Sequence, residues 1–540
     1  MQLTIQLQLK PNEAFDNMLL QQHISNTITQ PIDNITGFYI VKQSIDARSR
    51  QQVWIILTIK VFINEPFVTR KFDVITFPFL KKFAKQVVVV GAGPAGIFAA
   101  LKLIELGIKP IIIERGKDVR TRRRDLAILN KDGIVDTESN YCFGEGGAGT
   151  YSDGKLYTRS NKRGNIYRIL NLFVQFGANE KILTEAHPHI GTNKLPHIIT
   201  AMREQIIASG GEVLFEKKLV DCIIQNNELK GVKTSDGDTL MADAVILATG
   251  HSARDIFELL QQKNILIEAK PFALGVRIEH PQSIIDAAQY HLKNDTSEIP
   301  SRGKYLPPAS YSLVEQVQGK GVFSFCMCPG GIIAPAATNA NELVVNGWSP
   351  SKRNNPFANS GMVVTVEPND AVKSLSKYQH LSNAEKNNPL LLMYFQKMVE
   401  ANAFKAGGGK FVAPAQRVVD FCTNKLSASL PNCSYLPGIQ SVELEEVLPT
   451  FIQTRLQQAI QAFGKKMKGY YTNEAIVVAT ESRTSSPVRI PRDATTLQHP
   501  QIKNLYPCAE GAGYAGGIVS AAMDGENVAV AIAKKIISVS

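Results

Sequence analysis

The sequence predicts an α/β protein with a parallel central sheet, on three observations. Residues 87–90 are four consecutive valines, and they run directly into a glycine-rich turn, an apolar helix at 95–106 and a second apolar strand ending at 114. A strand, helix and strand within about 30 residues predict a right-handed βαβ unit. Continuous apolar runs also favour strands that are covered on both faces, as in parallel sheets. Two further short runs, 212–215 and 244–247, fit additional strands of the same sheet.

A different pattern comes before this unit. Residues 2–10 alternate strictly between apolar and polar side chains, which predicts a half-buried strand. A helical stretch from 11 to 24 and β-rich runs at 37–45 and 52–64 follow. We therefore expect residues 1–82 to form a small α+β N-terminal domain. A role in RNA binding or protein docking stays open, although the alternating faces fit a simple packed sheet.

The central part of the chain interrupts the parallel-sheet pattern. Residues 271–465 have mixed patterns and loops, whereas the segment from 505 returns to strand, glycines and helix. We therefore expect a Rossmann-type domain formed by 83–270 plus 466–540, with an inserted α+β second domain at 271–465 that covers the substrate side.

Composition excludes several classes of protein. The 540 residues are 44 % hydrophobic and 20 % charged, which excludes wholesale disorder. Seven scattered cysteines do not form a secreted disulfide framework and predict a reducing, cytoplasmic setting. The first ten residues lack the pattern of a signal peptide, and the longest apolar run, 87–101, is too short for a membrane span.

The turn after the valines carries the first binding motif. Gly91, Gly93 and Gly96 form G-x-G-x-x-G, in which they allow a tight turn, close approach of a pyrophosphate and helix–strand packing, respectively. Glu114 ends the next strand, where a carboxylate accepts hydrogen bonds from ribose hydroxyls and disfavours a 2′-phosphate. This pattern predicts FAD or NAD. The expected contacts here are Gly91, Ala92, Gly93, Pro94, Ala95, Gly96, Glu114 and Arg115.

The C-terminal segment favours FAD. A second G-x-G-x-x-G, at 511–516, is followed by only 24 residues, too few for another complete nucleotide site. A glycine-rich helix start placed last suits the ribityl chain and the isoalloxazine edge. There Glu510 would bind a ribityl hydroxyl, and the N–H groups of Gly517 and Ile518 would face the flavin N1/C2 carbonyl. With the strand end at 248–250, the expected contacts are Ala248, Thr249, Gly250, Glu510, Gly511, Gly516, Gly517 and Ile518.

A glycine-dense loop at 142–159 is predicted to cover the flavin and its pyrophosphate, because glycines let a backbone run close to a flat ligand. The alternative is a surface loop without a ligand. The residues expected to contact the cofactor are Gly144, Glu145, Gly146, Gly147, Thr150, Ser152 and Lys155.

Seven blocks from about residue 70 to the C-terminus resemble the bacterial FAD-dependent dehydrogenase-like proteins, also described as NAD(FAD)-utilising dehydrogenases. The blocks are CFGEGGAGTYSDGKLYTR, AHPHIGTNKL, GHSARDIF, PFALGVRIEHPQ, FCMCPGG, ESRTSSPVRI and GAGYAGGIVSAAMDG. The resemblance implies FAD binding and a glutathione-reductase-like FAD fold with an inserted second domain and a small N-terminal domain. It implies no substrate.

Catalytic residues are the least determined part of the site. His187 and His189 are candidate acid/base groups near a flavin, or loop histidines held by hydrogen bonds, and no third ligand accompanies them, so no metal is expected. Cys328 is a further candidate, since Cys326-Met-Cys328 suggests a dithiol. Residues two apart on a strand lie about 6.5 Å apart, at the strained end of disulfide geometry. The alternative is a small buried apolar residue.

Charge leaves two functions open. The net charge is +11, and residues 115–131, with seven cations and two aspartates, carry +5 of it. We expect an FAD-dependent oxidoreductase that transfers hydride to or from the flavin, with an unknown small-molecule substrate and with NAD(P)H as a candidate electron donor. The alternative is an FAD-binding RNA-modification or macromolecule-interaction protein. The basic stretch lacks aromatics, which counts against nucleic acid as a partner. Three further cations, Arg277, Arg483 and Arg489, are candidates for clamping an anion or for salt bridges.

Overall fold

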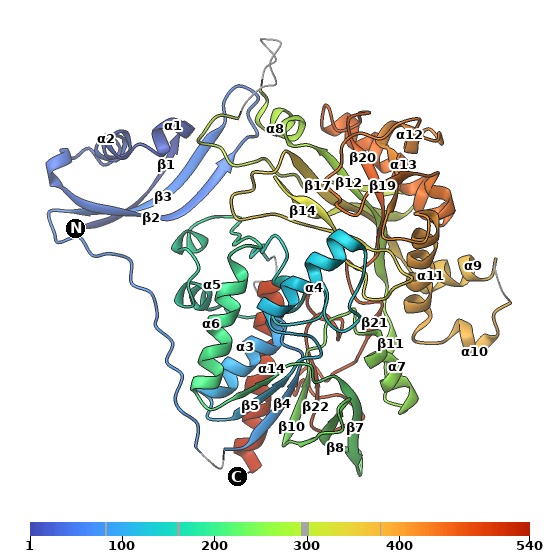
Figure 1. Cartoon of the computed structure of the whole chain (residues 1–540). Helices are drawn as coiled ribbons and strands as arrows, with labels where there is room; N and C mark the ends of the chain where they lie inside the picture. The colour runs from blue at the N-terminus through green and yellow to red at the C-terminus, as the bar shows by residue number, and fades with distance from the viewer. Residues whose placement is uncertain (82–83, 159–162, 293–301, 378–379, 540) are drawn as a thin grey trace.

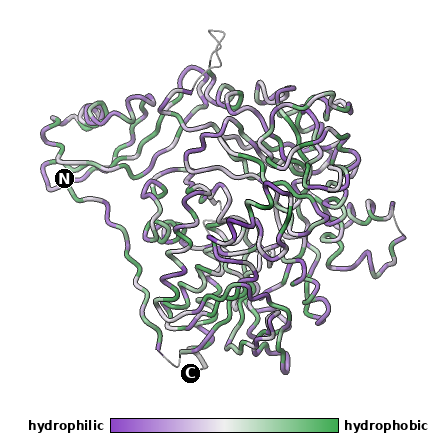
Figure 2. Tube along the Cα trace, in the orientation of Figure 1, coloured by the Kyte–Doolittle hydropathy of each residue, from purple (hydrophilic) through white to green (hydrophobic). Residues whose placement is uncertain are grey.

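The computed structural model describes residues 1–81, 84–158, 163–292, 302–377 and 380–539. Figure 1 shows three parts: a small N-terminal sheet, a parallel sheet flanked by helices, and a larger sheet that comes from the middle of the chain. Hydrophobic residues gather along the parallel sheet and its helices, as Figure 2 shows. Within the described residues, no helix is long and apolar enough to cross a membrane.

The parallel sheet has the order β22-β10-β4-β5-β6. Its strands are β4 (Gln86–Val90), β5 (Lys109–Ile113), β6 (Glu212–Leu214), β10 (Ala244–Leu247) and β22 (Leu505–Pro507). The strands expected at 212–215 and 244–247 are thus confirmed as members of this sheet.

Both faces of the parallel sheet are covered, which explains the unbroken apolar runs. Val87 and Val89 pack with the helices of one face, whereas Val88 and Val90 pack with elements of the other. The first face carries α3 (Pro94–Glu105), α5 (Ile166–Gln175), α6 (Leu195–Ala208) and α14 (Ile518–Val539). The second carries α7 (Arg254–Gln262) and the antiparallel strands β7 (Leu219–Gln225), β8 (Glu228–Thr234) and β9 (Thr239–Met241).

The N-terminal part is a three-stranded antiparallel sheet of order β1-β3-β2 with its own apolar core. Its elements are β1 (Gln2–Leu9), α1 (Pro11–Ala14), α2 (Asn17–Ile28), β2 (Ile35–Asp46) and β3 (Trp54–Ile63). The strands and the helical stretch agree with the sequence pattern. From residue 64 to residue 81 the described chain has no helix or strand, and the Leu80 N–H fastens this segment by donating to the Ser209 carbonyl at 2.9 Å.

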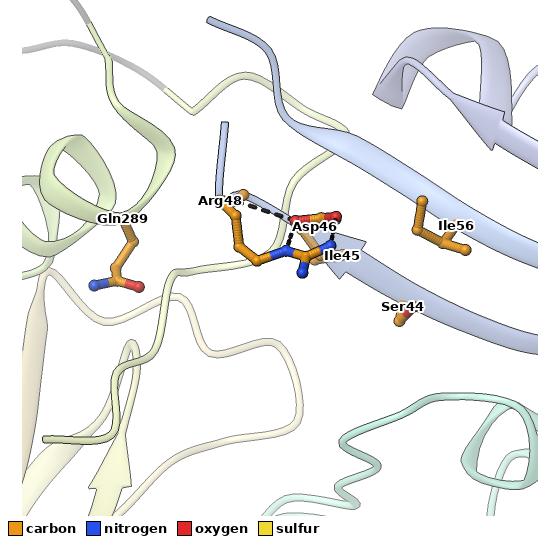
Figure 3. Close-up of a pocket in the computed structure, with 7 residues that line it drawn as sticks. Ser44, Ile45, Asp46, Arg48, Ile56 and Gln289 are labelled. Atoms are coloured by element: carbon orange, nitrogen blue, oxygen red, sulfur yellow. Dashed lines mark hydrogen bonds and ion pairs between the residues drawn. The ribbon is translucent and has the colours of Figure 1, made fainter. Parts of the chain in front are cut away.

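A pocket lies where the end of β2 meets the large middle part. It has a volume of about 490 Å³ and is lined by Asp46, Arg48 and Gln289, among others (Figure 3). Arg48 and Asp46 form an ion pair across 2.6 Å at its rim.

The middle of the chain forms a seven-stranded sheet of order β13-β14-β17-β12-β20-β18-β19, with a large apolar core. Its strands are β12 (Phe272–Pro281), β13 (Val314–Val317), β14 (Lys320–Cys328), β17 (Phe357–Val366), β18 (Ala413–Arg417), β19 (Ile439–Ser441) and β20 (Ile476–Glu481). The other elements are α4 (Val119–Asp132), α8 (Gln282–Tyr290), α9 (Pro368–Leu375), α10 (Asn383–Lys386), α11 (Leu391–Ala406), α12 (Val418–Cys422), α13 (Thr450–Lys466), β11 (Glu268–Ala269), β15 (Ile332–Pro335), β16 (Val345–Trp348) and β21 (Val488–Arg489).

Strand β20 lies in the segment after residue 466, which we expected to belong to the Rossmann-type domain. This strand pairs with β12 and β18 inside the seven-stranded sheet, so the chain stays in that sheet until Glu481. Residues 476–479 are apolar and the whole strand is buried, which makes it look like a strand of the parallel sheet in the sequence. We propose that the second domain ends after Glu481.

Candidate functional site

The turn between β4 and α3 has the geometry that its glycines require. Gly91 has φ +106°, and a Cβ on Gly96 would lie 1.9 Å from the Gly91 carbonyl oxygen, so neither position accepts a side chain. For a Cβ on Gly93, the only atom within contact range is the Gly147 Cα at 4.0 Å. The turn therefore leaves space at Gly93, beside the free N–H groups that open α3.

Glu114 ties this turn to two other segments. Its carboxylate accepts hydrogen bonds from the N–H groups of Ala92 at 2.8 Å, Gly116 at 3.0 Å and Gly144 at 2.9 Å, and the residue is only 5 % exposed. Each carboxylate oxygen has two lone pairs, so these three bonds leave acceptor capacity for a ribose hydroxyl.

A cavity of about 590 Å³ opens beside Glu114, at the carboxyl ends of β5 and β6. Arg115, Lys117 and Lys218 are among the residues that line it. Arg115 also lies over the Phe143 ring at 4.4 Å and is ion-paired with Asp255, so protein contacts fix its position.

The loop at 142–155 lies directly on the glycine turn. The Gly146 N–H donates to the Ala92 carbonyl at 2.8 Å, and a Cβ on Gly147 would lie 3.2 Å from the Gly93 Cα. Gly149 lies against Ile518, at the start of α14. The loop therefore spans the starts of both α3 and α14.

Several loop residues expected to contact the cofactor also have protein partners. The Glu145 carboxylate accepts from the Val119 N–H at 2.8 Å and from Arg203 at 3.0 Å, which places it against the start of α4. The Thr150 hydroxyl donates to the Glu145 carbonyl, and the Ser152 hydroxyl to the Gly149 carbonyl. These side chains brace the loop from within.

Arg122 of α4 binds the backbone of the same loop. Its guanidinium is fully buried and donates to the carbonyl oxygens of Asn140 at 2.8 Å, Tyr141 at 2.9 Å and Glu145 at 2.8 Å. Arg122 is therefore a member of the basic stretch 115–131 that is not exposed to solvent. Lys117 is also paired, with Asp125 and Asp136. The exposed cations of α4 and its end are Arg120, Arg123, Arg124 and Lys131.

The C-terminal glycines lie beside the end of β10. A Cβ on Gly511 would lie 2.6 Å from the Gly250 carbonyl oxygen, so the two segments touch. Gly250 and Gly517, in contrast, have no atom within contact range of a Cβ. A Cβ on Gly525 would lie 2.1 Å from the Ala95 carbonyl oxygen, which shows how closely α14 packs against α3. The starts of the two helices are thereby brought together.

Two buried polar atoms at this junction have no hydrogen-bond partner among the residues that the structure describes. They are the Thr249 hydroxyl and His251 Nε2, while His251 Nδ1 lies 3.5 Å from the Glu510 carboxylate. Unpaired buried polar atoms next to open glycines are the arrangement expected where a polar ligand binds. The residues present therefore fit an FAD. Sequence reasoning did not select His251, although it lies one residue after the predicted strand end.

The two histidine candidates, His187 and His189, both have protein partners. His187 stacks on Tyr157 at 4.7 Å, and His189 Nε2 lies 3.2 Å from the Ser351 carbonyl oxygen. Burial lowers the pKa of both histidines, and the charge of Arg353 lowers it further, so both are neutral at pH 7. No group of three or more His, Cys, Asp or Glu side chains in the described parts of the chain could hold a metal ion.

Two cations lie beside Cys326 and Cys328 on β14 of the seven-stranded sheet. Lys155 Nζ lies 3.5 Å from Cys326 Sγ and 3.7 Å from Cys328 Sγ, and Arg277 Nη2 lies 3.5 Å from Cys328 Sγ. Arg277 is itself fully buried and ion-paired with Glu481 at 2.8 Å. Lys155, expected at the cofactor, thus lies with the two thiols.

The backbone at Cys326 departs from a regular strand. A bulge shifts the register of β14 against β17 between Phe325 and Cys328, and Cys326 has φ +46°. This conformation costs a non-glycine residue about 1–3 kcal/mol. The hydrogen bond between the two cysteine side chains, together with the charges of Lys155 and Arg277, lowers the pKa of Cys326 well below its usual value.

The other candidate cations mostly serve as ion pairs. Arg483 joins Glu342 and Glu400 at 3.0 Å each, and Arg254 of α7 binds the same two carboxylates. This buried four-residue cluster connects α7 to the second sheet. Arg489 lies over the Tyr514 ring at 5.2 Å.

The fold and this junction define an FAD-binding protein, and comparisons with known proteins agree. Residues 84–129 match the profile of an FAD binding domain, residues 271–484 that of an FAD-dependent protein, C-terminal domain-like, and residues 1–62 a domain of unknown function (DUF8436). A protein of Clostridium beijerinckii, named only as an uncharacterized protein, is 39 % identical over 537 residues, covering 96 % of each chain. The chain belongs to this family of FAD-dependent proteins.

More distant likenesses add little. A thiamine thiazole synthase of Aeropyrum pernix is 28 % identical over 35 % of this chain and 64 % of its own. The flavin-dependent brominase Bmp2 is 12 % identical, with 84 % and 79 % of the two chains covered and a TM-score of 0.35. The glycine oxidase of Bacillus cereus is 14 % identical, with 84 % and 95 % covered and a TM-score of 0.31. Such low scores support no inference about activity.

Proposed function

We propose that this protein is an FAD-dependent oxidoreductase of glutathione-reductase-like fold, which transfers hydride between a small-molecule substrate and the flavin. The observation that carries the proposal is the junction of α3 and α14, where the space at Gly93, Gly250 and Gly517 adjoins the unpaired atoms of Thr249 and His251. Two adjacent helix starts would offer N–H groups to the pyrophosphate of an FAD and to the flavin edge that becomes negative on reduction.

The roles of the chain's residues follow from their positions. The N–H groups that open α3 would bind the pyrophosphate, with the loop at 144–150 as a cover. The N–H groups of Gly517 and Ile518 would face the flavin edge that becomes negative on reduction, and Glu510 with His251 would hold the ribityl hydroxyls. When bound, FAD supplies a two-electron acceptor.

The substrate side and the electron donor form the second part of the proposal. The seven-stranded sheet meets the loop at Lys155 and would form the substrate side, and NAD(P)H remains the proposed electron donor. A cytoplasmic location remains a prediction from the cysteine pattern.

The test is the colour and chemistry of the purified protein. We expect oxidised-flavin absorbance from one FAD per chain, and anaerobic bleaching by NADH, NADPH or a member of a substrate panel. A colourless protein that takes up no added FAD would overturn the proposal.

A second function, binding of an RNA, is favoured by one observation, the exposed cations Arg120, Arg123 and Arg124 on one turn of α4. Neutralising these three while keeping the buried Arg122 should abolish salt-sensitive tRNA binding. Absence of such binding in the unmodified protein removes this alternative.

A further inference from the structure

The cysteine pair on β14 has a chemical environment that a purely structural thiol does not need. Two cations reach the sulfurs: Lys155 touches both of them, and Arg277 touches Cys328. A buried cysteine that only fills space packs against apolar side chains, as Cys222 does between Leu219 and Val232. Cations beside a thiol stabilise the thiolate, which is the reactive form of cysteine.

The geometry also favours contact between the two sulfurs. The bulge in β14 and the positive φ of Cys326 break the regular alternation that would hold residues two apart at the edge of disulfide range. Lys155 Nζ lies within hydrogen-bonding distance of both sulfurs, so the two thiols surround one ammonium group. Cys328 is fully buried while Cys326 is half-buried, which leaves the pair open on one side.

The cluster is linked to the cofactor site by one short segment. The loop that packs Gly149 against Ile518 reaches the thiols six residues later, at Lys155. Six residues span at most about 20 Å when fully extended. The same loop therefore contacts the start of α14 at one end and the cysteine pair at the other.

We propose that Cys326 and Cys328 are a redox-active dithiol that closes to a disulfide and delivers its electron pair to the flavin. This inference rests on the proposed function for the identity of the electron acceptor. In the step, the Cys326 thiolate forms the S–S bond with Cys328, the Cys328 S–H bond breaks, and two electrons with one proton leave as a hydride equivalent to oxidised flavin. Lys155 and Arg277 hold the thiolate before the step.

Other charged groups around the pair complete this environment. Asp153 lies 3.7 Å from Lys155 and is paired with Arg353 at 2.6 Å, and Glu481 is paired with Arg277. Asp153 and Glu481 are thus each bound to a cation, which limits their repulsion of the thiolate.

The first experiment detects the disulfide without relying on activity. The full-length protein is equilibrated in glutathione buffers of graded ratio, alkylated and digested, and the peptide containing residues 326 and 328 is analysed by mass spectrometry. We expect one midpoint at which this peptide loses two hydrogens and resists alkylation. The Cys422→Ala variant, which removes a buried cysteine elsewhere in the second domain, should show the same midpoint. A peptide that stays fully alkylated across all buffers overturns the inference.

The second experiment counts electrons per FAD in an anaerobic dithionite titration of the oxidised protein. We expect two electron pairs per FAD for the unmodified protein and for Cys422→Ala, but one pair for Cys326→Ser and for Cys328→Ser. One pair in all four proteins, with FAD bound and reduced normally, refutes the dithiol and leaves the proposed function standing. Failure to bind FAD with the disulfide midpoint intact refutes the electron acceptor and the proposed function instead.

Discussion

Arg122 offers the sharpest test of how the cofactor loop is built. It donates to three carbonyl oxygens of the loop at 140–145, each at 2.8 or 2.9 Å, and no water reaches its fully buried guanidinium. The Arg122→Met substitution keeps the apolar stem and removes all three donors. The carbonyls of Asn140 and Tyr141 would then lose this donor, that of Glu145 would keep only the Thr150 hydroxyl, and the penalty for burying the charge would be relieved.

The magnitude follows from these contacts. Each of the two unpaired acceptors costs about 1–3 kcal/mol, and part of that sum is offset by the charge no longer buried, so we expect a net loss of about 2–4 kcal/mol. For a folding unit of this size, each kcal/mol lowers the melting temperature by about 2–4 °C, so a decrease on the order of 10 °C should follow.

The assay compares Arg122→Met with Arg123→Met, the exposed neighbour on the same helix. Thermal unfolding is followed by circular dichroism, and FAD affinity by quenching of flavin fluorescence. We expect Arg122→Met to lose both stability and FAD affinity while Arg123→Met retains them. Equal melting temperatures and equal FAD affinities in the two variants would refute the assigned role of Arg122.

Three further predictions follow. Gly93→Ala should keep the fold, because the new Cβ meets only one atom, at 4.0 Å, but it should weaken FAD binding at least about tenfold. Gly96→Ala should instead destabilise the apoprotein, because its Cβ would lie 1.9 Å from a carbonyl oxygen. Equal FAD affinity of Gly93→Ala and the unmodified protein in a fluorescence titration would contradict the first expectation. Arg254 and Arg483 lower the pKa of Glu400 from 4.5 to about 2, so the contribution of this carboxylate to folding stability is complete above about pH 4.5 and is lost as pH falls toward 2. The difference in the free energy of unfolding between the unmodified protein and Glu400→Gln, measured in urea, should therefore shrink over that range. A difference that stays constant would count against this role of Glu400. Lys155→Met should raise the pKa of Cys326, because it removes a cation that stabilises the thiolate. The rate at which Cys326 reacts with iodoacetamide at pH 7 should fall about tenfold for each unit by which this pKa rises. Lys181→Met is the control, and an unchanged dependence of the rate on pH in Lys155→Met would exclude the role of Lys155.

Local sequence was sufficient for the parts of the fold that depend on neighbouring residues. The valines of β4, the glycine turn and the alternation of β1 all appear where the pattern predicts them. Each follows from steric and burial rules that act over a few residues.

The sheet to which residues 476–481 belong was not predictable in this way. Residues 476–479 are as apolar as the strands of the parallel sheet, yet the strand that they begin lies between β12 and β18 of the other sheet. A fully buried strand has the same composition in either sheet, so only its pairing partners distinguish the two cases.

The cysteine pair shows the same limit at the level of chemistry. The sequence places Cys326 and Cys328 on one strand, but Lys155 lies 171 residues from Cys326. A cation changes the pKa of a thiol strongly only when it lies within a few ångströms, so the local sequence does not predict which cation will be beside it.

By itself, the sequence determined the glycine turn, the acid that follows it and the second glycine motif, and these were sufficient to select FAD. Only the tertiary structure decided that Arg122 is buried beneath the loop and that Lys155 and Arg277 meet two thiols. Backbone motifs depend on the conformations that a few adjacent residues can adopt, whereas the reactivity of a side chain depends on which distant charges the folded chain brings beside it.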